Sequence, residues 1–288
     1  MAFGRQGKRF SVPRGGEVAV LSDLHGNAHA LEAAASQLEH YNRENHGVVQ
    51  TVVILGDLFT YGVQPNQIIE GVLALANDYD LWLVVGNHDE FYMPCLGKVE
   101  EASDGHVGWI EEVIEWTRAR LDRDLLEEID DLSLWHYELS DGGLLLSHAN
   151  PFGVGDWTYL NGEDVREQAL DVVRDRGFKL GLFGHTHRRF ARHLSVDGER
   201  RGLEGHELLK RDVEVDQGWW VMNPGSIGQP RQNDPRSSFA ILGRRSGGWT
   251  VRLRPVKYEP QDQIREIEAT AMSSETKGRL IGYLSKSQ

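Results

Sequence analysis

The chain has 288 residues, of which 40% are hydrophobic and 26% charged, and this composition excludes a wholly disordered or collagen-like chain. A formal net charge of −13 disfavours duplex nucleic acid and anionic membrane surfaces as partners. The only cysteine, Cys95, excludes both an intrachain disulfide and a thiolate metal cluster within one chain.

The N-terminal ten residues are basic, but no apolar run follows them, and no apolar stretch of 18 residues occurs in the sequence. We therefore expect neither a secretory signal peptide nor a membrane span, and a cytoplasmic location. The sequence has no internal repeat, no low-complexity tract and no evident linker. These features predict one domain that spans residues 1–288.

Strands and helices alternate in the first half of the chain. Short apolar runs predict strands at 17–22, 51–55 and 81–85, and apolar residues at helical spacing predict helices at 28–41 and 66–76. Strands this apolar, separated by helices, indicate a largely parallel sheet that is covered on both faces. Ligands of such sheets bind beyond the carboxyl ends of the strands.

The second half begins with an acidic helical insertion at 91–135. Its apolar stripe, which predicts core packing, comprises Trp109, Ile110, Val113, Ile114 and Trp116. A helix is expected at 165–176, and further strands are expected at 144–147, 180–183, 219–222, 238–242 and 249–253. Residues 195–217 predict an exposed excursion of two strands or a loop, and residues 261–288 predict a C-terminal helical tail.

Polar side chains follow five of the predicted strands. They are Asp23 and His25, Asp57, the run from Asn87 through His88 to Asp89, His148, and the pair His185 and His187. One such residue alone is more often a helix cap or a hydrogen-bonded structural residue than a ligand. Five such endings at one sheet edge gather carboxylates and imidazoles that need cations between them. Nitrogen and oxygen donors favour Mn, Fe, Zn or Co, and two ions about 3.5 to 4 Å apart form the clamp used in phosphoryl hydrolysis.

These five blocks, in this order, resemble the signature of the calcineurin-like metallophosphoesterase superfamily. The resemblance implies a four-layer α/β/β/α sandwich of two mixed sheets flanked by helices. It also implies two ion sites that share Asp57, the first completed by Asp23, His25 and His187 and the second by Asn87, His148 and His185. His88 would act near the leaving-group oxygen as general acid or transition-state stabiliser, with Asp89 orienting it.

The segments 22–27 and 223–231 resemble the prokaryotic branch related to diadenosine tetraphosphatases and serine/threonine phosphatases. This resemblance implies substrate contacts by Asn27, Ser226 and Arg231, although a Pro/Gly-rich turn explains the second segment equally well. Protein phosphatases and symmetrical dinucleoside tetraphosphatases usually carry an arginine in the second block. Residues 56–62 contain none, which counts against a protein-phosphatase assignment.

The resulting expectation is a dinuclear metal hydrolase that acts on phosphoester or phosphoanhydride bonds of small nucleotides such as dinucleoside polyphosphates, with attack by a metal-bridging hydroxide. The insertion should stand over the site as a partial cap, in which Glu111, Glu112 and Glu115 repel nucleic acid. Trp109 and Trp116 offer a stacking face for a base if they are not wholly buried. A serine/threonine protein phosphatase or general phosphodiesterase is one alternative. A binding scaffold of the same fold without catalysis is another.

Overall fold

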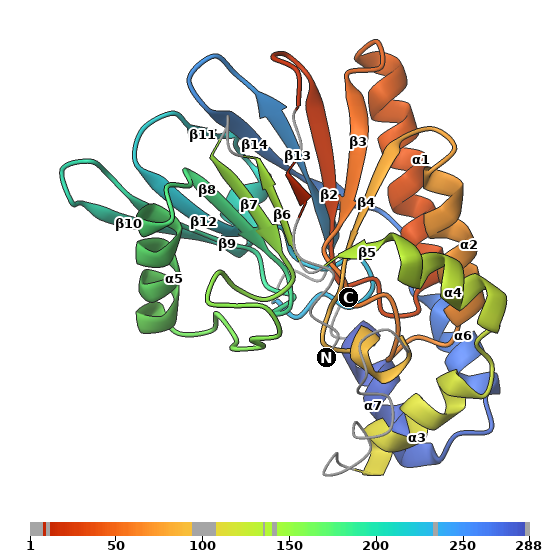
Figure 1. Ribbon diagram of the computed structural model, residues 1–288. Coiled ribbons are helices and arrows are strands. Elements are labelled where there is room, and N and C mark those ends of the chain that lie inside the picture. Colours follow the sequence, from red (N-terminus) through yellow and green to blue (C-terminus); the bar gives the residue numbers. More distant parts are fainter. Residues whose placement is uncertain are drawn as a thin grey trace.

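The computed structural model describes residues 8–9, 12–93, 108–134, 136–139, 143–232 and 236–285. Within these residues, two seven-stranded sheets lie face to face with helices on their outer sides (Figure 1). Across the first sheet the order is β11 (Val213–Val215), β14 (Trp249–Val256), β13 (Ser237–Arg244), β2 (Glu17–Leu21), β3 (Val49–Ile54), β4 (Asp80–Val84) and β5 (Ser133–Leu134). Across the second it is β1 (Lys8–Arg9), β6 (His136–Leu139), β7 (Leu144–Ser147), β8 (Leu180–Phe183), β12 (Trp219–Asn223), β9 (Phe190–Leu194) and β10 (Arg200–Glu204).

Both sheets are mixed. In the first, β2, β3 and β4 are parallel, whereas β13 is antiparallel to β2. In the second, β7, β8 and β12 are parallel, whereas β6 is antiparallel to β7. The four-layer sandwich implied by the resemblance is confirmed. The strands predicted in the first half of the chain are parallel neighbours as expected, but the expectation that all five polar strand endings belong to one parallel sheet is wrong. A strand between a helical layer and a second sheet is buried on both faces, so its sequence looks like that of a strand between two helical layers.

Alternate residues along each central strand serve different layers of the core, as the two-residue period of a strand requires. Val18 and Val20 of β2 pack in the core between the sheets together with Leu144 and Leu146 of β7. Ala19 of β2 belongs to the outer core that faces α1 (Ala28–Glu44) and α2 (Pro65–Leu75). The outer face of the second sheet is covered by α5 (Glu163–Asp175). The predicted helices and strands thus lie close to their predicted positions.

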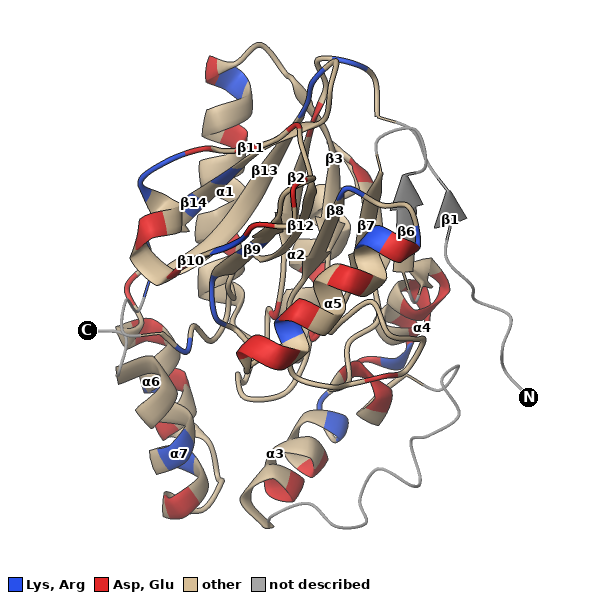
Figure 2. Ribbon diagram, turned by 90° about the vertical axis from the view of Figure 1, so that its left-hand side faces the viewer, with Lys and Arg blue, Asp and Glu red and all other residues tan. Residues whose placement is uncertain are grey.

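Three further helices gather at one end of the sandwich (Figures 1 and 2). These are α3 (Gly108–Arg118), α6 (Gln261–Ala269) and α7 (Ser274–Ser285). Val113 of α3 packs with Ile267 of α6 and Leu280 of α7 in one apolar cluster. The core role predicted for the apolar stripe is confirmed, because Ile110, Val113 and Ile114 are buried.

The rest of the insertion contributes α4 (Arg123–Leu132) and the short η1 turn (Asp89–Phe91), while its residues 94–107 and 135, Cys95 among them, lie outside the described residues. The segment 195–217 contains two strands at the edges of different sheets, β10 and β11, joined through η4 (Gly205–Leu209). Leu208, Val213 and Val215 of this segment are buried in the core between the sheets. No helix in the described parts of the chain has the length and apolar character needed to cross a membrane.

Candidate metal centre

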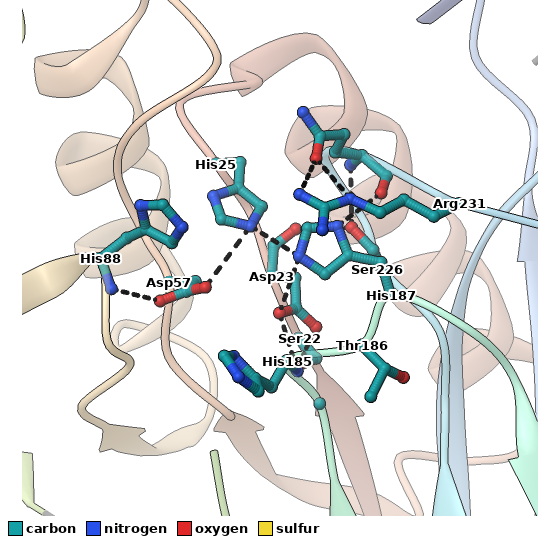
Figure 3. Close-up of polar contacts among 12 residues, drawn as sticks. Ser22, Asp23, His25, Asp57, His88, His185, Thr186, His187, Ser226 and Arg231 are labelled. Atoms are coloured by element: carbon teal, nitrogen blue, oxygen red, sulfur yellow. Dashed lines mark hydrogen bonds and ion pairs between the residues drawn. The ribbon is translucent and has the colours of Figure 1, made fainter. Parts of the chain in front are cut away.

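The polar strand endings of both sheets converge at the same end of the sandwich (Figure 3). β2, β3 and β4 of the first sheet deliver Asp23 and His25, Asp57, and the Asn87–His88 pair, and β7 and β8 of the second deliver His148 and the pair His185 and His187. Convergence was expected from one sheet. The structure achieves it with two, because the parallel strands of the packed sheets end at the same place.

The buried Asp and His side chains form two groups. Asp23, His25, Asp57 and His187 offer ligand atoms that all lie within 4.8 Å of one another, and Asp57, His148 and His185 do the same. Asp57 is common to both groups. The Asn87 side-chain oxygen lies 3.2 Å from His148 Nε2, beside the second group. The structure therefore brings together all seven residues that the resemblance implied as ligands.

The hydrogen bonds fix the tautomers of two facing histidines. The Nδ1 atom of His25 lies 2.9 Å from the Phe59 carbonyl oxygen, and that of His187 lies 2.7 Å from the Gln229 carbonyl oxygen. A carbonyl oxygen only accepts, so each Nδ1 atom carries the proton and each Nε2 atom of the neutral rings carries a lone pair. The two Nε2 atoms are 2.9 Å apart. Two lone pairs at that distance repel each other unless a cation lies between them.

The Asp57 carboxylate also has the surroundings of a cation ligand. Its Oδ1 atom accepts a hydrogen bond from the His88 backbone N–H at 2.8 Å, whereas its buried Oδ2 atom has no hydrogen-bond partner in the described part of the chain. That Oδ2 atom lies 3.5 Å from His25 Nε2 and 3.3 Å from His148 Nε2. A buried carboxylate oxygen without a partner is costly. The orphaned oxygen, the facing lone pairs and the donor set fit divalent cations.

Burial and mutual charge shift the ionisation of these groups strongly. Burial lowers the pKa of His25 and of His185 to about 3 and raises the pKa of Asp23 to about 7. Burial alone would lower the pKa of His148, but the charges of Asp57 and Asp23 outweigh it and raise that pKa to about 9.

The backbone is strained at five of the candidate ligands, all of which follow the ends of strands. Asp23, His25, Asp57, His185 and His187 all have φ between 47° and 64°, a region that non-glycine residues rarely adopt. Neighbouring glycines make room, since a Cβ at Gly86 would overlap the Asp57 carboxylate and a Cβ at Gly184 would overlap Ser22 Oγ. Strain of this kind is concentrated at functional sites.

Asp89 binds backbone groups of two loops of the site. Its two carboxylate oxygens accept hydrogen bonds from the backbone N–H groups of Asp57, Leu58 and Gly86, each at 2.8 Å. Asp89 makes no hydrogen bond to the His88 Nδ1 atom, so an orienting effect of Asp89 on that ring would act through the backbone of the loop that carries both residues. The carboxylate joins the second block to the third.

Aromatic packing holds the His88 ring. The ring centroid lies 5.2 Å from that of His25, 4.9 Å from that of Tyr61 and 5.6 Å from that of Phe91, with edge-to-face geometry. Its Nδ1 atom is buried and has no hydrogen-bond partner among the described residues. Burial lowers the pKa of His88 to about 4, so the ring is neutral at pH 7.

Asn27 is a helix cap. Its side-chain oxygen accepts from the Ala30 backbone N–H at 3.1 Å at the start of α1. Its side-chain nitrogen donates to the Gly228 carbonyl at 3.0 Å and to the Tyr258 hydroxyl at 3.1 Å. Since these polar atoms are taken and buried, the expectation that Asn27 contacts substrate is contradicted.

Ser226 is a brace for the first block. Its hydroxyl donates to the Asp23 carbonyl oxygen and accepts from the Gln229 backbone N–H, both at 2.8 Å, and the residue is fully buried. The expected contact of Ser226 with phosphate is therefore contradicted too. The structure favours the turn interpretation of this segment for Ser226, while Arg231 at its end does face the metal ligands (Figure 3).

Arg231 is held beside the centre by a side chain and two rings. Its Nε and Nη2 atoms donate to Gln229 Oε1 at 2.9 and 2.6 Å. Its guanidinium carbon lies 5.4 Å from the Tyr61 ring centroid and 5.3 Å from that of Tyr283. The Gln229 carbonyl also accepts the His187 Nδ1–H. One residue thus connects Arg231 to a candidate ligand.

Sequence reasoning missed four aromatic residues of the site. Tyr159 stacks on His185 with 3.9 Å between ring centroids, and the Trp157 carbonyl oxygen lies 3.0 Å from His185 Nε2. Tyr61 lies in the second block and was within reach of the motif, whereas Trp157 and Tyr159 come from a loop without a motif, and Tyr283 comes from the C-terminal tail. Trp109 and Trp116 are partly buried against the α3–α7 cluster, and each has an arginine over its ring, Arg279 over Trp109 and Arg120 over Trp116. The expectation that they offer a stacking face stays a prediction.

A profile of the calcineurin-like phosphoesterase superfamily domain matches residues 17–247. The chain belongs to this superfamily. It is therefore a metal-dependent phosphoester hydrolase, with buried Asp and His groups that fit a divalent metal centre. A binding scaffold that has lost catalysis would be expected to lack some of the metal ligands. All seven candidate ligands predicted from the sequence lie in the two groups or beside them.

The relatives span most of the chain. An uncharacterized protein of Methanocaldococcus jannaschii is 31% identical over 251 residues, which are 87% of this chain and 91% of that protein. The asymmetrical bis(5'-nucleosyl)-tetraphosphatase PrpE of Anoxybacillus flavithermus is 27% identical over 194 residues, 58% of this chain and 77% of that protein.

Two solved structures share the fold over nearly their whole length. The metallophosphoesterase from Sphaerobacter thermophilus is 23% identical, with a TM-score of 0.67 and coverage of 93% of this chain and 99% of its own. A hypothetical protein from Pyrococcus horikoshii is 19% identical, with a TM-score of 0.70 and coverage of 92% and 97%.

Proposed function

We propose that this phosphoesterase binds two divalent transition-metal ions, with Mn or Fe preferred over Zn or Co. The first ion would be held by Asp23, His25, Asp57 and His187, and the second by Asp57, Asn87, His148 and His185. The observation that carries this proposal is the buried Oδ2 atom of Asp57, which lies between the two groups without a hydrogen-bond partner among the described residues. Bound there, two such ions supply Lewis acidity and an activated water for attack on phosphorus.

The chain's own residues complete the reaction site. The neutral His88 ring, with its lowered pKa, is suited to donate a hydrogen bond to the leaving-group oxygen, and this favours transition-state stabilisation over general acid catalysis. Arg231 supplies a guanidinium for the phosphate oxygens, as planar N–H donors match phosphate geometry. Asp89 keeps the two loops in register through three backbone N–H groups.

For the substrate we propose small nucleotides, dinucleoside polyphosphates first. The similarity to PrpE supports this class. The half-exposed Tyr159, 44% accessible, presents a ring beside the centre on which a base can stack. We further propose that α3 of the insertion, together with α6 and α7, forms the partial cap of a single domain, which limits bulky substrates.

The test compares kcat/KM for diadenosine tetraphosphate, ATP, a phosphoserine peptide and a generic phosphodiester with one metal, Mn. The proposal expects diadenosine tetraphosphate to be the best substrate. A clear preference for the peptide would establish the serine/threonine phosphatase alternative, and a preference for the generic diester would establish a phosphodiesterase. Metal binding without turnover of any of the four would indicate a binding scaffold.

A further inference from the structure

The C-terminal helix α7 reaches the candidate site although it lies outside the matched family domain. The profile ends at residue 247, and α7 covers Ser274–Ser285. Tyr283 of this helix lies with its ring centroid 5.8 Å from that of Tyr61 and 5.3 Å from the guanidinium carbon of Arg231. The family core alone therefore does not supply the full surroundings of Arg231.

Arg231 is confined on several sides. Tyr61 and Tyr283 present their rings to the guanidinium, and the Gln229 side chain accepts from two of its nitrogens. A long, flexible arginine loses rotamer freedom when it binds phosphate, and a guanidinium already held between rings has less freedom left to lose. The Tyr61 ring is itself fixed, because it packs edge-on against His25 and His88.

The position of α7 is fixed by α3. The Glu112 carboxylate of α3 accepts from the Ser273 backbone N–H at 2.6 Å, from the Ser273 hydroxyl at 2.7 Å and from the Thr276 hydroxyl. Ser273 itself caps α7, because its hydroxyl accepts from the Thr276 backbone N–H at 3.2 Å, and Glu112 holds this cap in place. Leu280 and Leu284 then pack the helix against Val113 and Ile267. The ring of Tyr283 is thus held by a helix whose start and apolar face are both anchored.

We propose that α7 is part of the phosphate-binding site and that Tyr283 is a positioning residue, which acts through Arg231 by holding its guanidinium toward the metal centre. The inference rests on the proposed function only in the assignment of a phosphate contact to Arg231. It does not depend on nucleotides being the substrate. A chromogenic phosphomonoester, p-nitrophenyl phosphate, and inorganic phosphate as product inhibitor therefore serve as probes.

The central variant is Tyr283→Ala. Loss of one cation–π contact predicts a rise of about three- to tenfold in KM and in the inhibition constant for phosphate, with kcat changed less than about twofold. Tyr283→Phe retains the ring and is expected to restore both constants to within about twofold of the wild-type values. If Tyr283→Ala does not fold, Tyr283→Leu, which fills most of the same volume without a ring, replaces it with the same expectation.

Leu280→Ala is the matched control. It removes apolar packing from α7 but leaves the Tyr283 ring in place, so it should lower the melting temperature while KM stays within about twofold. If Leu280→Ala raises KM as much as Tyr283→Ala does, the effect belongs to the stability of α7 and the proposal is wrong.

The double variant decides whether Tyr283 acts through Arg231. In an Arg231→Ala background, Tyr283→Ala should have no further effect on the phosphate inhibition constant. Additive effects would overturn the positioning role. Unchanged phosphate inhibition in Tyr283→Ala would overturn it even if diadenosine tetraphosphate is hydrolysed well, whereas coupled effects together with poor nucleotide hydrolysis would overturn only the nucleotide assignment.

Discussion

Asp57 is the residue on which both ion sites depend. One of its carboxylate oxygens is taken by the His88 backbone and the other lies between the two histidine groups. In Asp57→Asn, an amide places an N–H₂ group or a neutral oxygen there and cannot neutralise two cations. We expect no more than one tightly bound ion per chain and the largest loss of turnover among single ligand changes. Elemental analysis after gel filtration measures the ions, and two retained ions would contradict the bridging role.

A substitution of His88 should affect catalysis without affecting metal binding. The ring is held by His25, Tyr61 and Phe91 and belongs to neither group of candidate ligands. His88→Asn is therefore expected to keep the metal content and to lose about 10²- to 10⁴-fold in kcat, as the loss of a positioned hydrogen-bond donor to the transition state does. A variant that binds less metal but turns over normally at saturating metal would show that His88 is a ligand.

His148 makes metal binding depend on pH. Because the charges of Asp57 and Asp23 raise its pKa to about 9, His148 carries a proton at pH 7.5 in the metal-free protein, and a cation must displace that proton. Apparent affinity for the second ion should therefore fall about tenfold for each unit of pH lost between 8 and 7. Calorimetric titration in two buffers of different ionisation enthalpy counts the released protons. Affinity independent of pH in this range would refute the assignment.

At the scale of elements, the sequence predicted the parts of the site better than their assembly. The strand ends that carry Asp23, Asp57 and His148 were located because apolar runs stop there and donor residues follow. That β7 belongs to a second sheet could not be read from its residues, since Leu144, Leu145 and Leu146 are as buried as a strand between two helical layers would be. Periodicity reports burial, and it does not report what covers the strand.

The loops also show that the sequence predicted where residues lie better than what they contact. Asn27 and Ser226 were predicted at the right place but with the wrong role, because a polar residue near a metal site serves equally well as a hydrogen-bonding support. Tyr283 carried no local signal at all. Its position depends on how α7 docks on α3, and that docking is set by the Glu112 carboxylate and by apolar contacts between distant segments.

The contact between α3 and α7 is testable by itself. Glu112→Ala removes the acceptor that ties Ser273 and Thr276 to α3, and we expect a loss of about 0.5 to 1.5 kcal/mol of unfolding free energy, as for the loss of a hydrogen bond. Amide hydrogen exchange should accelerate in 274–285. Glu115→Ala, an exposed glutamate on the same helix, serves as the control and should leave both measurements unchanged. Equal exchange in the two variants would show that Glu112 does not anchor α7.

At the scale of the whole molecule, the net charge of the chain is opposite in sign to the charge expected at the candidate site. The chain has a net charge of −13, and Figure 2 shows acidic residues along α3, α4 and α5. The candidate site, by contrast, contains Arg231 and would hold two divalent cations. An approaching polyanion is therefore repelled by the molecule at long range and attracted by the site at short range.

Varying the ionic strength distinguishes the long-range repulsion by the whole chain from the short-range attraction by the site. The screening length is about 30 Å at 0.01 M salt and about 8 Å at 0.15 M, so added salt removes the repulsion of the whole molecule before it removes contacts within the site. With saturating Mn, kcat/KM for diadenosine tetraphosphate should rise when salt increases from 0.01 to 0.15 M. The singly charged bis(p-nitrophenyl) phosphate should change less, because its interaction with the same field is weaker. A fall in kcat/KM for the tetraphosphate over this range would mean that the cations of the site, and not the charge of the whole chain, govern the encounter.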